Sequence, residues 1–303
     1  MENLLSTKEV AEYLGVNEKM IYTLINEKEL PATKITGKWL FPKSLVEQWV
    51  ASRTINYPKQ PVSAVQIPNL LLIAGSNDIL LDRALALFRR LNPGHVAFFG
   101  NLGSIGGLKS LKEGLCHIAT SHLAEENEKE YNFSFAADFL EESPVVVNFC
   151  RREQGLLVPK GNPKGIQGIA DIGHKDLVVA NRSLETSTRV LFDRELKKAG
   201  LDCRHVAGYE CEFQSHLDVG LEILAGRADT GLAIGAVATV LGLDFIPMQW
   251  ERFDLLIPKS EFFTQSTQLF LELLRGEGFL HLVDGLSGYD LNLCGKVVYP
   301  AES

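Results

Sequence analysis

Small polar residues stand where two apolar, strand-like runs of the sequence give way to helical patterns. The run LLLIAG is followed by Ser76-Asn77 ahead of DILLDRALALFRRL, and VAFFGNL is followed by Gly103-Ser104 ahead of IGGLKSLKEG. Such a junction leaves helix N-terminal amides free and adds a hydroxyl donor, so it can hold an anion. Ser and Asn are also ordinary N-caps, and one junction alone favours that interpretation.

The second half of the chain repeats the pattern. We expect one helix to start around residues 186–189, a second to begin near Ser215-His216, a turn at Gly226, and a strand over 231–234. Helix capping can explain a single polar strand end, but it explains less well several polar strand ends that converge on one cleft. The number of junctions therefore favours a ligand site.

The same residues do not form a catalytic set. Ser215, His216 and Asp218 are too close together on one helix to act as nucleophile, base and orienting group. No GxSxG, HExxH or Walker pattern occurs, and the five cysteines lack CxxC spacing. We expect a protein that is not an enzyme and has no metal site or cofactor.

Charge is divided unevenly along the 303 residues. The formal net charge is −8, yet residues 1–53 hold as many Lys and Arg as Asp and Glu, so the whole excess lies after Arg53. The N-terminus lacks the pattern of a signal peptide, and no run approaches the ~18 apolar residues of a membrane span. We expect a cytoplasmic protein without a membrane partner, with a neutral N-terminal module and an acidic body.

Two short helices are predicted in the N-terminal module. The first spans 7–14, with Ser6 or Thr7 as cap and Gly15 as its end. Asn17 can cap the second, whose apolar face runs through Met20 or Ile21, Leu24 and Ile25 before Pro31 ends it. This spacing is typical of a helix-turn-helix unit.

A hairpin and a third helix complete this module. Strand-like runs over 32–35 and 38–41 flank Thr36-Gly37, and KSLVEQWVAS predicts a helix that turns Leu45, Trp49 and Val46 toward the core.

Residues 3–50 resemble the excisionase/MerR-type winged helix-turn-helix family. The segment that carries the resemblance is STKEVAEYLGVNEKMIYTLINEKELPATKITGKWLFPKSLVEQWV. The resemblance implies binding to double-stranded DNA through the second helix and the wing, by Asn17, Lys19, Tyr22, Thr23, Asn26, Lys34 and Lys38. A neutral module makes few phosphate contacts, so we expect a homodimer. The alternative is a solvated helix pair that contacts a protein.

The acidic body alternates strand-like and helical segments, which indicates an α/β domain with mostly parallel strands. We divide the chain into a winged helix-turn-helix domain (1–53), a proline-containing linker (54–67) and a ligand-binding domain (68–303). Within the last, PVVVNF and GLLVPKG read as separate strands, and Asp229 as a structural residue of the turn before 231–234.

Residues 68–300 resemble the type II periplasmic-binding-protein superfamily, specifically the PBP-like domain that is fused to helix-turn-helix regulators and related to molybdate-binding proteins. The segments that carry the resemblance are NRSLETSTRVLFD, GLEILAGRADTGLAI, LGLDFIPMQWERFDLLIP and GYDLNLCGKV. It implies two lobes, about 68–150 with 251–303 and about 151–250, and a molybdate- or tungstate-like oxyanion between them.

Carried over residue by residue, Ser76 and Ser104 match the two serines of the molybdate binders, and His216 and Ile234 match two positions in the other lobe. The predicted ligand contacts are Ser76, Asn77, Gly103, Ser104, Ser187, Thr188, Arg189, Ser215, His216 and Ile234. Three departures matter: Ile234 replaces a tyrosine, His216 a small apolar residue and Glu185 a glycine. Arg189 adds a cation, so an organic anion stays open.

These observations together predict an α/β multidomain protein, a small winged helix-turn-helix followed by a two-lobed PBP-like domain. The predicted function is that of a one-component transcriptional regulator, whose DNA binding is controlled by a small anion. The alternative is a cytoplasmic sensor of an oxyanion or small organic anion that acts through a protein partner.

Overall fold

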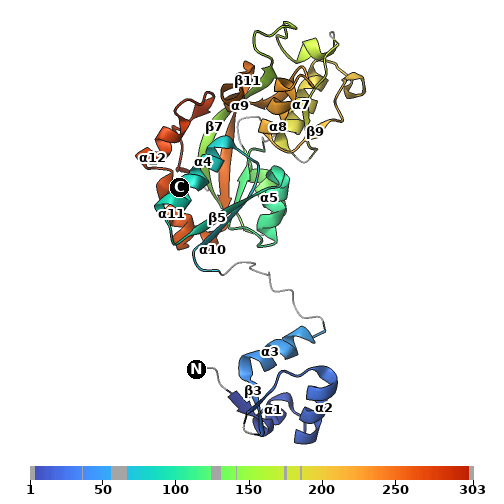
Figure 1. The fold of residues 1–303 in the computed structure, drawn as a ribbon, viewed down its shortest axis with the longest axis vertical. Coiled ribbons are helices and arrows are strands. Elements are labelled where there is room, and N and C mark those ends of the chain that lie inside the picture. Colours follow the sequence, from blue (N-terminus) through green and yellow to red (C-terminus); the bar gives the residue numbers. More distant parts are fainter. Residues whose placement is uncertain are drawn as a thin grey trace. The chain divides into compact units, whose positions relative to one another are not determined.

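The computed structural model describes residues 4–35, 37–55, 67–123, 131–140, 142–173, 176–184 and 186–299. Two compact units divide the chain, Met1–Gln60 and Pro61–Ser303 (Figure 1). We call them the N-terminal unit and the sensor unit. Most of the predicted linker, 56–66, and Glu185 lie outside the described residues.

The N-terminal unit is three helices and a three-stranded antiparallel sheet of order β1-β3-β2. Its elements are β1 (Leu4–Ser6), α1 (Thr7–Leu14), α2 (Glu18–Lys28), β2 (Thr33–Ile35), β3 (Lys38–Pro42) and α3 (Lys43–Ser52). Ser6 and Glu9 cap α1 reciprocally, Gly15 ends it at φ 66°, and Asn17 caps α2. Strand β1, which pairs with β3, was not predicted.

The core of this unit is small and apolar. It contains Val10, Ala11, Ile21, Leu30, Phe41 and Val46. Ile21 rather than Met20 faces inward on α2, since Met20 is 44% exposed. The prediction that Leu45 faces the core is wrong: Val46 fills that place and Leu45 lies at the surface.

The sensor unit begins with alternating strands and helices. Its first elements are β4 (Leu70–Gly75), α4 (Ile79–Leu91), β5 (Val96–Asn101), α5 (Gly103–Lys112), β6 (Ile118–Ser121), α6 (Phe133–Phe139) and β7 (Val145–Val158). A 3-10 turn (Ile169–Gly173), β8 (Asn181–Arg182), α7 (Ser187–Lys198), a second 3-10 turn (Cys203–His205), β9 (Glu212–Phe213), α8 (His216–Leu224), β10 (Gly231–Ile234) and α9 (Gly235–Leu241) follow. The chain returns through β11 (Asp244–Ile257), α10 (Lys259–Phe262), α11 (Gln265–Leu273), α12 (Glu277–Leu280), a third 3-10 turn (His281–Val283), β12 (Tyr289–Asp290) and β13 (Val297–Tyr299).

The main sheet has the order β10-β7-β11-β6-β4-β5, with β12 and β13 also paired to β7. Strands β5 and β6 run parallel to β4, whereas β11 is antiparallel to both β6 and β7. The prediction of mostly parallel strands therefore holds only around β4. The two runs predicted as separate strands are one strand, β7, in which alternate polar residues between the runs, Arg152 and Gln154, are buried in the sheet.

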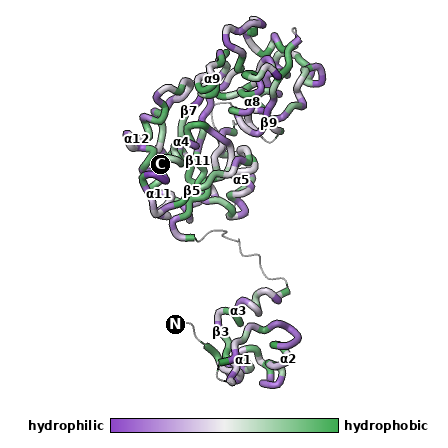
Figure 2. The backbone as a smooth tube through the Cα atoms, in the orientation of Figure 1, coloured by the Kyte–Doolittle hydropathy of each residue, from purple (hydrophilic) through white to green (hydrophobic). Residues whose placement is uncertain are grey.

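Strands β7 and β11 join two halves of the sensor unit. Alternate residues of β4 face α4 and α11 on one side (Leu71, Ile73) and α5 on the other (Leu72, Ala74), which builds the first half. The second half packs α7, α8 and α9 around β10, through Phe192, Val219 and Val237 among others. Figure 2 shows apolar residues along the central strands of the sheet. None of the described helices has the length and hydropathy that crossing a membrane requires.

Candidate ligand site

Ser76 is placed by the tight end of β4. Gly75 has a φ of 134°, and a Cβ there would overlap the carbonyl of Thr120, so only glycine fits. The turn buries Ser76 to 1% exposure and puts its Oγ 2.9 Å from Nε2 of His122, the residue that follows β6. Asn77 comes next, and its carbonyl accepts a hydrogen bond from Arg152.

Ser104 lies in the first turn of α5, directly after Gly103 at φ 69°. Its Oγ accepts the backbone N–H of His122 at 3.3 Å and the hydroxyl of Ser187 at 3.0 Å. Ser187 begins α7 in the second half. Ser104 and Ser187 thus meet across the two halves, and Ser76 and Ser104 both contact His122.

An ionic cluster in which the charged side chains are paired with one another lies at the centre of β7 and β11. We call Asp78, His122, Arg152, Gln154 and Glu251 the hinge cluster. Arg152 donates from Nε to Glu251 at 2.6 Å and from Nη1 to Asp78 at 2.8 Å, and Glu251 also accepts from Gln154 and faces Nδ1 of His122. Burial raises the pKa of Glu251, but His122 and Arg152 outweigh it and lower that pKa to about 2.

Two further basic residues, Arg182 and His216, face this region without partners. Arg182 is 2% exposed and His216 1% exposed. Nε and Nη1 of Arg182, both ring nitrogens of His216 and Nη2 of Arg152 have no hydrogen-bond partner among the described residues. We call Arg182 and His216 the unpaired cluster.

The pKa values show that the members of the unpaired cluster act on one another. Burial, and then the charge of Arg152, lower the pKa of Arg182 to about 10 against the opposing effect of Asp218. Burial, Arg182, Arg152 and His122 together hold the pKa of His216 well below its usual value. Several donors and an uncompensated guanidinium therefore converge on one buried place, which is the complement of an anion.

Arg189, predicted to contact the ligand, is instead fully engaged within the second half. It donates to Asp193 and Glu212, each at 3.1 Å, and its guanidinium carbon lies 4.1 Å from the ring centre of Tyr209. Nη1 also donates to the carbonyl of Arg182. The contacts make Arg189 a residue that positions the Arg182 backbone.

The remaining predicted contacts have local roles. Ser215 caps α8 through a reciprocal pair with Asp218 and so places His216 at the first position of the helix. Thr188 accepts from Gln154 at 3.2 Å. Ile234 ends β10 within the apolar core of the second half, where its side chain offers only van der Waals contact.

Two arginines of the site were missed by sequence reasoning. Arg182 lies two positions after the apolar run DLVVA, in the segment that also contains Arg189, so the position of a strand end was a usable signal. Arg152 gave no such signal, because it lies in a polar run, CRREQ, that reads as a loop.

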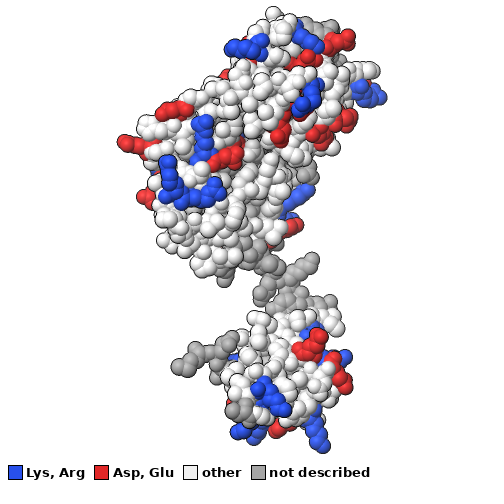
Figure 3. Space-filling model, in the orientation of Figure 1, with Lys and Arg blue, Asp and Glu red and all other residues white. Residues whose placement is uncertain are grey.

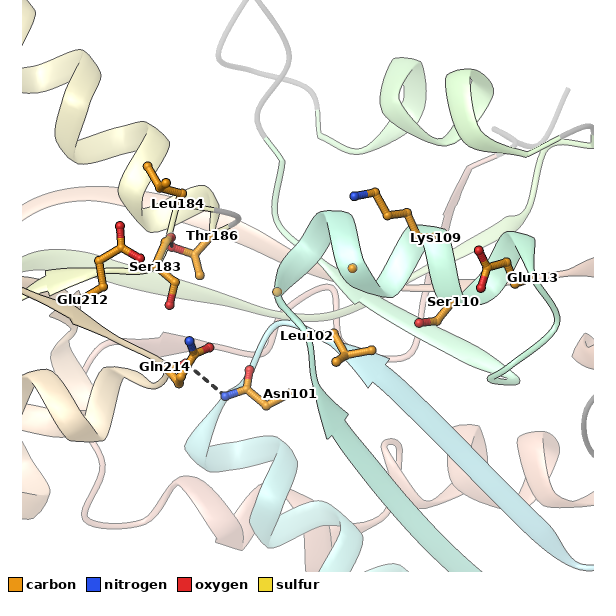
Figure 4. Close-up of a pocket in the computed structure, with 12 residues that line it drawn as sticks. Asn101, Leu102, Lys109, Ser110, Glu113, Ser183, Leu184, Thr186, Glu212 and Gln214 are labelled. Atoms are coloured by element: carbon orange, nitrogen blue, oxygen red, sulfur yellow. Dashed lines mark hydrogen bonds between the residues drawn. The ribbon is translucent and has the colours of Figure 1, made fainter. Parts of the chain in front are cut away.

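An open groove of about 550 Å³ lies between α5 and the segment that precedes α7, and Gly103 and Thr186 are in its lining. Figure 4 shows Asn101, Leu102 and Lys109 on the side of α5, and Ser183, Leu184 and Thr186 opposite them. Asn101 donates to the carbonyl of Gln214 at 3.0 Å and so ties the two walls together.

The residues predicted to meet DNA lie on the surface of the N-terminal unit. Asn17, Lys19, Tyr22, Thr23 and Asn26, on or next to α2, are all exposed. Asn17 uses its side-chain oxygen to cap the helix at Met20. On the hairpin, Lys34 and Lys38 are exposed, and Lys34 lies 5.5 Å from the ring centre of Trp39. Figure 3 shows basic and acidic side chains interspersed over the visible face of this unit.

Family models match both units. Residues 4–54 match a helix-turn-helix domain, and residues 85–275 match the PBP superfamily domain. The chain belongs to the PBP superfamily domain family. It joins that ligand-binding domain to an N-terminal, excisionase-like helix-turn-helix domain, which confirms both resemblances and the α/β multidomain fold.

Relatives and solved structures agree with this architecture. The chain is 27% identical to the uncharacterized protein YvgK of Bacillus subtilis (strain 168) over 304 residues, 96% of each chain. The fold is similar to that of a putative phosphate ABC transporter substrate-binding protein with bound phosphate from Clostridium perfringens (TM-score 0.54, 15% identity, 71% of this chain and 97% of that one). It is also similar to the tungstate ABC transporter structure from Geobacter sulfurreducens (TM-score 0.50, 16% identity, 71% and 97%).

Proposed function

We propose that this protein is a ligand-responsive transcriptional regulator whose DNA binding is controlled by a small anion held in the unpaired cluster. The combination of a helix-turn-helix domain with a PBP-like ligand-binding domain supports a ligand-sensing regulator. The observation that supports an anionic ligand is that Arg182 is a buried cation whose Nε and Nη1 have no partner among the described residues.

The energetics of burial favour an anionic ligand. An unpaired charge in a protein interior costs several kcal/mol, and a bound anion removes that cost while it satisfies the free donors. Guanidinium edges suit both carboxylates and tetrahedral oxyanions. Molybdate or tungstate, the ligand that the resemblance implies, is therefore one candidate beside organic anions. The protein binds this ligand without turning it over.

The site can couple ligand binding to conformation because its donors come from both halves. Ser76 and Ser104 belong to the first half, and Arg182 and His216 to the second. An anion that contacts both sets stabilises the closed arrangement in proportion to its differential affinity for that arrangement. In a homodimer, closure would change the spacing of the two recognition helices, which must match half-sites about one helical turn apart.

A thermal-shift screen tests whether the protein binds an anion and whether that binding depends on Arg182. We would compare molybdate, tungstate, phosphate, sulfate and small carboxylates on the wild type, Arg182→Met and Arg189→Met. At least one anion should raise the melting temperature of the wild type and of Arg189→Met but not of Arg182→Met. Equal stabilisation of all three proteins would contradict the assignment of Arg182.

A gel-shift titration of the protein against the upstream region of its own gene tests the proposed DNA binding. We expect specific, salt-sensitive binding that the active anion alters, and a weaker complex for Tyr22→Ala, which replaces an exposed side chain of α2. Lys112→Ala, on α5 of the sensor unit, is the control. Unaltered binding by Tyr22→Ala, or no specific binding at all, would favour action through a protein partner instead.

A further inference from the structure

A second, smaller cavity adjoins the site. It measures about 190 Å³ and lies between the residues after β6 and the start of α7. Most of its wall is apolar and comes from Ile105, Leu123, Phe135, Leu184, Val190 and Leu191. None of these residues belongs to the ligand contacts predicted from the sequence.

The polar wall of this cavity is shared with the anion site. His122, Ser187 and Glu251 line it. His122 contacts Ser76 through Nε2, Ser187 donates to Ser104, and Glu251 binds Arg152. The cavity therefore shares His122, Ser187 and Glu251 with the anion site.

The polar groups in this wall are already engaged. Glu251 accepts from Arg152 and Gln154 and faces His122, and Arg194 donates to Glu195 and Gln249. The hydroxyl of Tyr131 donates to the carbonyl of Trp250 at 3.4 Å. The wall therefore favours an apolar occupant over an ion.

The rim of the cavity exposes large aliphatic side chains. Leu184 is 67% exposed and Val190 60% exposed, and both line the cavity. Covering such side chains with an apolar group removes apolar area from water, at about 25 cal/mol per Å². By volume, an apolar cavity of about 150 Å³ is known to hold a benzene ring.

We propose that the physiological ligand is an organic anion, a carboxylate or phosphonate-like group joined to one ring-sized apolar group. The anionic head binds at the unpaired cluster, and the apolar group occupies the cavity formed with Leu184, Val190 and Leu191. This inference rests on the proposed function and narrows its ligand class. Inorganic oxyanions would fill the head position and leave the apolar contact unmade.

Matched phosphonates test the inference by calorimetry on the full-length protein. Phenylphosphonate and methylphosphonate present the same head and differ in the apolar group. We expect phenylphosphonate to bind at least tenfold more tightly to the wild type, and both to lose binding to Arg182→Met. Equal affinities, with binding still dependent on Arg182, would overturn the inference and leave the proposed function standing. No Arg182-dependent binding of either phosphonate, phosphate or molybdate would overturn both.

Substitutions in the cavity test the binding of the apolar group separately from that of the anionic head. Val190→Phe narrows the mouth at an exposed position of α7, and Ile105→Phe fills the cavity from α5. Either should reduce the preference for the phenyl compound to less than threefold while the affinity for methylphosphonate stays unchanged. Lys197→Gln, a change at an exposed position of α7, is the control. A phenyl preference that survives both substitutions would contradict placement in this cavity.

Discussion

The hinge cluster and the unpaired cluster each contain a buried arginine, and the two differ in what surrounds it. Arg152 meets Glu251 at 2.6 Å and Asp78 at 2.8 Å, and Asp78 in turn accepts from Tyr289. Arg182 meets no carboxylate within hydrogen-bond distance at Nε or Nη1. Both side chains are buried, so burial alone does not tell a structural charge from a binding one.

Pairing with carboxylates distinguishes the two arginines. A buried cation that is paired with buried carboxylates is part of the fold, because removing one member leaves the others charged and buried. A buried cation with free donors destabilises the ligand-free protein and is compensated only by a partner from outside the chain. The hinge cluster should therefore report on stability, and the unpaired cluster on ligand binding.

Removing Arg152 should have the largest effect on stability. Arg152→Ala leaves Asp78 and Glu251 buried without their shared cation, so we expect the free energy of unfolding to fall by about 3–5 kcal/mol. Urea unfolding of the ligand-free protein at pH 7 measures it. A loss below about 1 kcal/mol would show that the hinge cluster is not the stabilising element described above.

The two clusters should also lose stability in different pH windows. The pKa of Glu251 is depressed to about 2, so its contribution is complete above its unfolded pKa near 4.5 and disappears as the pH falls toward 2. The total loss is about 3 kcal/mol. The pKa of His216 is also lowered, by burial first, but this group is a base. The unfolded chain takes up its proton below pH 6.5 while the folded chain does not, so stability declines from there, by up to about 1.4 kcal/mol per pH unit.

Urea unfolding between pH 8 and pH 3 separates these windows. His216→Gln should flatten the slope between pH 6.5 and 4.5, and Glu251→Gln the slope below 4.5. A saturating anion should reduce the upper slope, because an adjacent negative charge favours protonated His216. Profiles of His216→Gln and wild type that coincide above pH 4.5 would show that His216 is not held neutral.

Local chemistry made much of the fold predictable. Ser6, Asn17 and Ser215 each cap the helix that follows them, and Gly15 and Gly226 adopt the positive φ that ends a helix or a turn. These features depend on residues a few positions apart, so a single sequence contains them. The placement of Ser76 and Ser104 at strand ends follows from the same local rules.

The charged interior depends on distant residues and was therefore not predictable from pattern alone. Arg152 is compensated by Asp78 and Glu251, which are 74 and 99 positions away in the chain. Without those partners a polar run such as CRREQ favours a loop, and β7 was accordingly divided into two strands. Arg189 was predicted to contact the ligand, but its side chain is engaged by Glu212 and Tyr209. These partners are brought close to it only by the fold, so the sequence pattern did not indicate them.

Removing Arg182 should change stability in the direction opposite to Arg152. Arg182→Met replaces an unpaired buried cation by an apolar side chain of similar length, so we expect the ligand-free protein to become more stable by about 2 kcal/mol. Urea unfolding without and with the active anion measures both effects, with Arg152→Met as the matched control. A strong destabilisation by Arg182→Met in the absence of anion would remove the distinction between the two clusters.

The smallest effect is expected at Arg189, and it decides between the predicted and the observed role of that residue. Asp193 and Glu212 are partly exposed, so the ion pairs of Arg189 are screened, and the main loss in Arg189→Met is the bond to the Arg182 carbonyl. We expect about 1 kcal/mol of destabilisation. Because the anion is held by the Arg182 side chain, its affinity should change by less than threefold in calorimetric titration. A loss of binding as large as that of Arg182→Met would return Arg189 to the ligand contacts, and would mean that the closed halves rearrange when the anion binds.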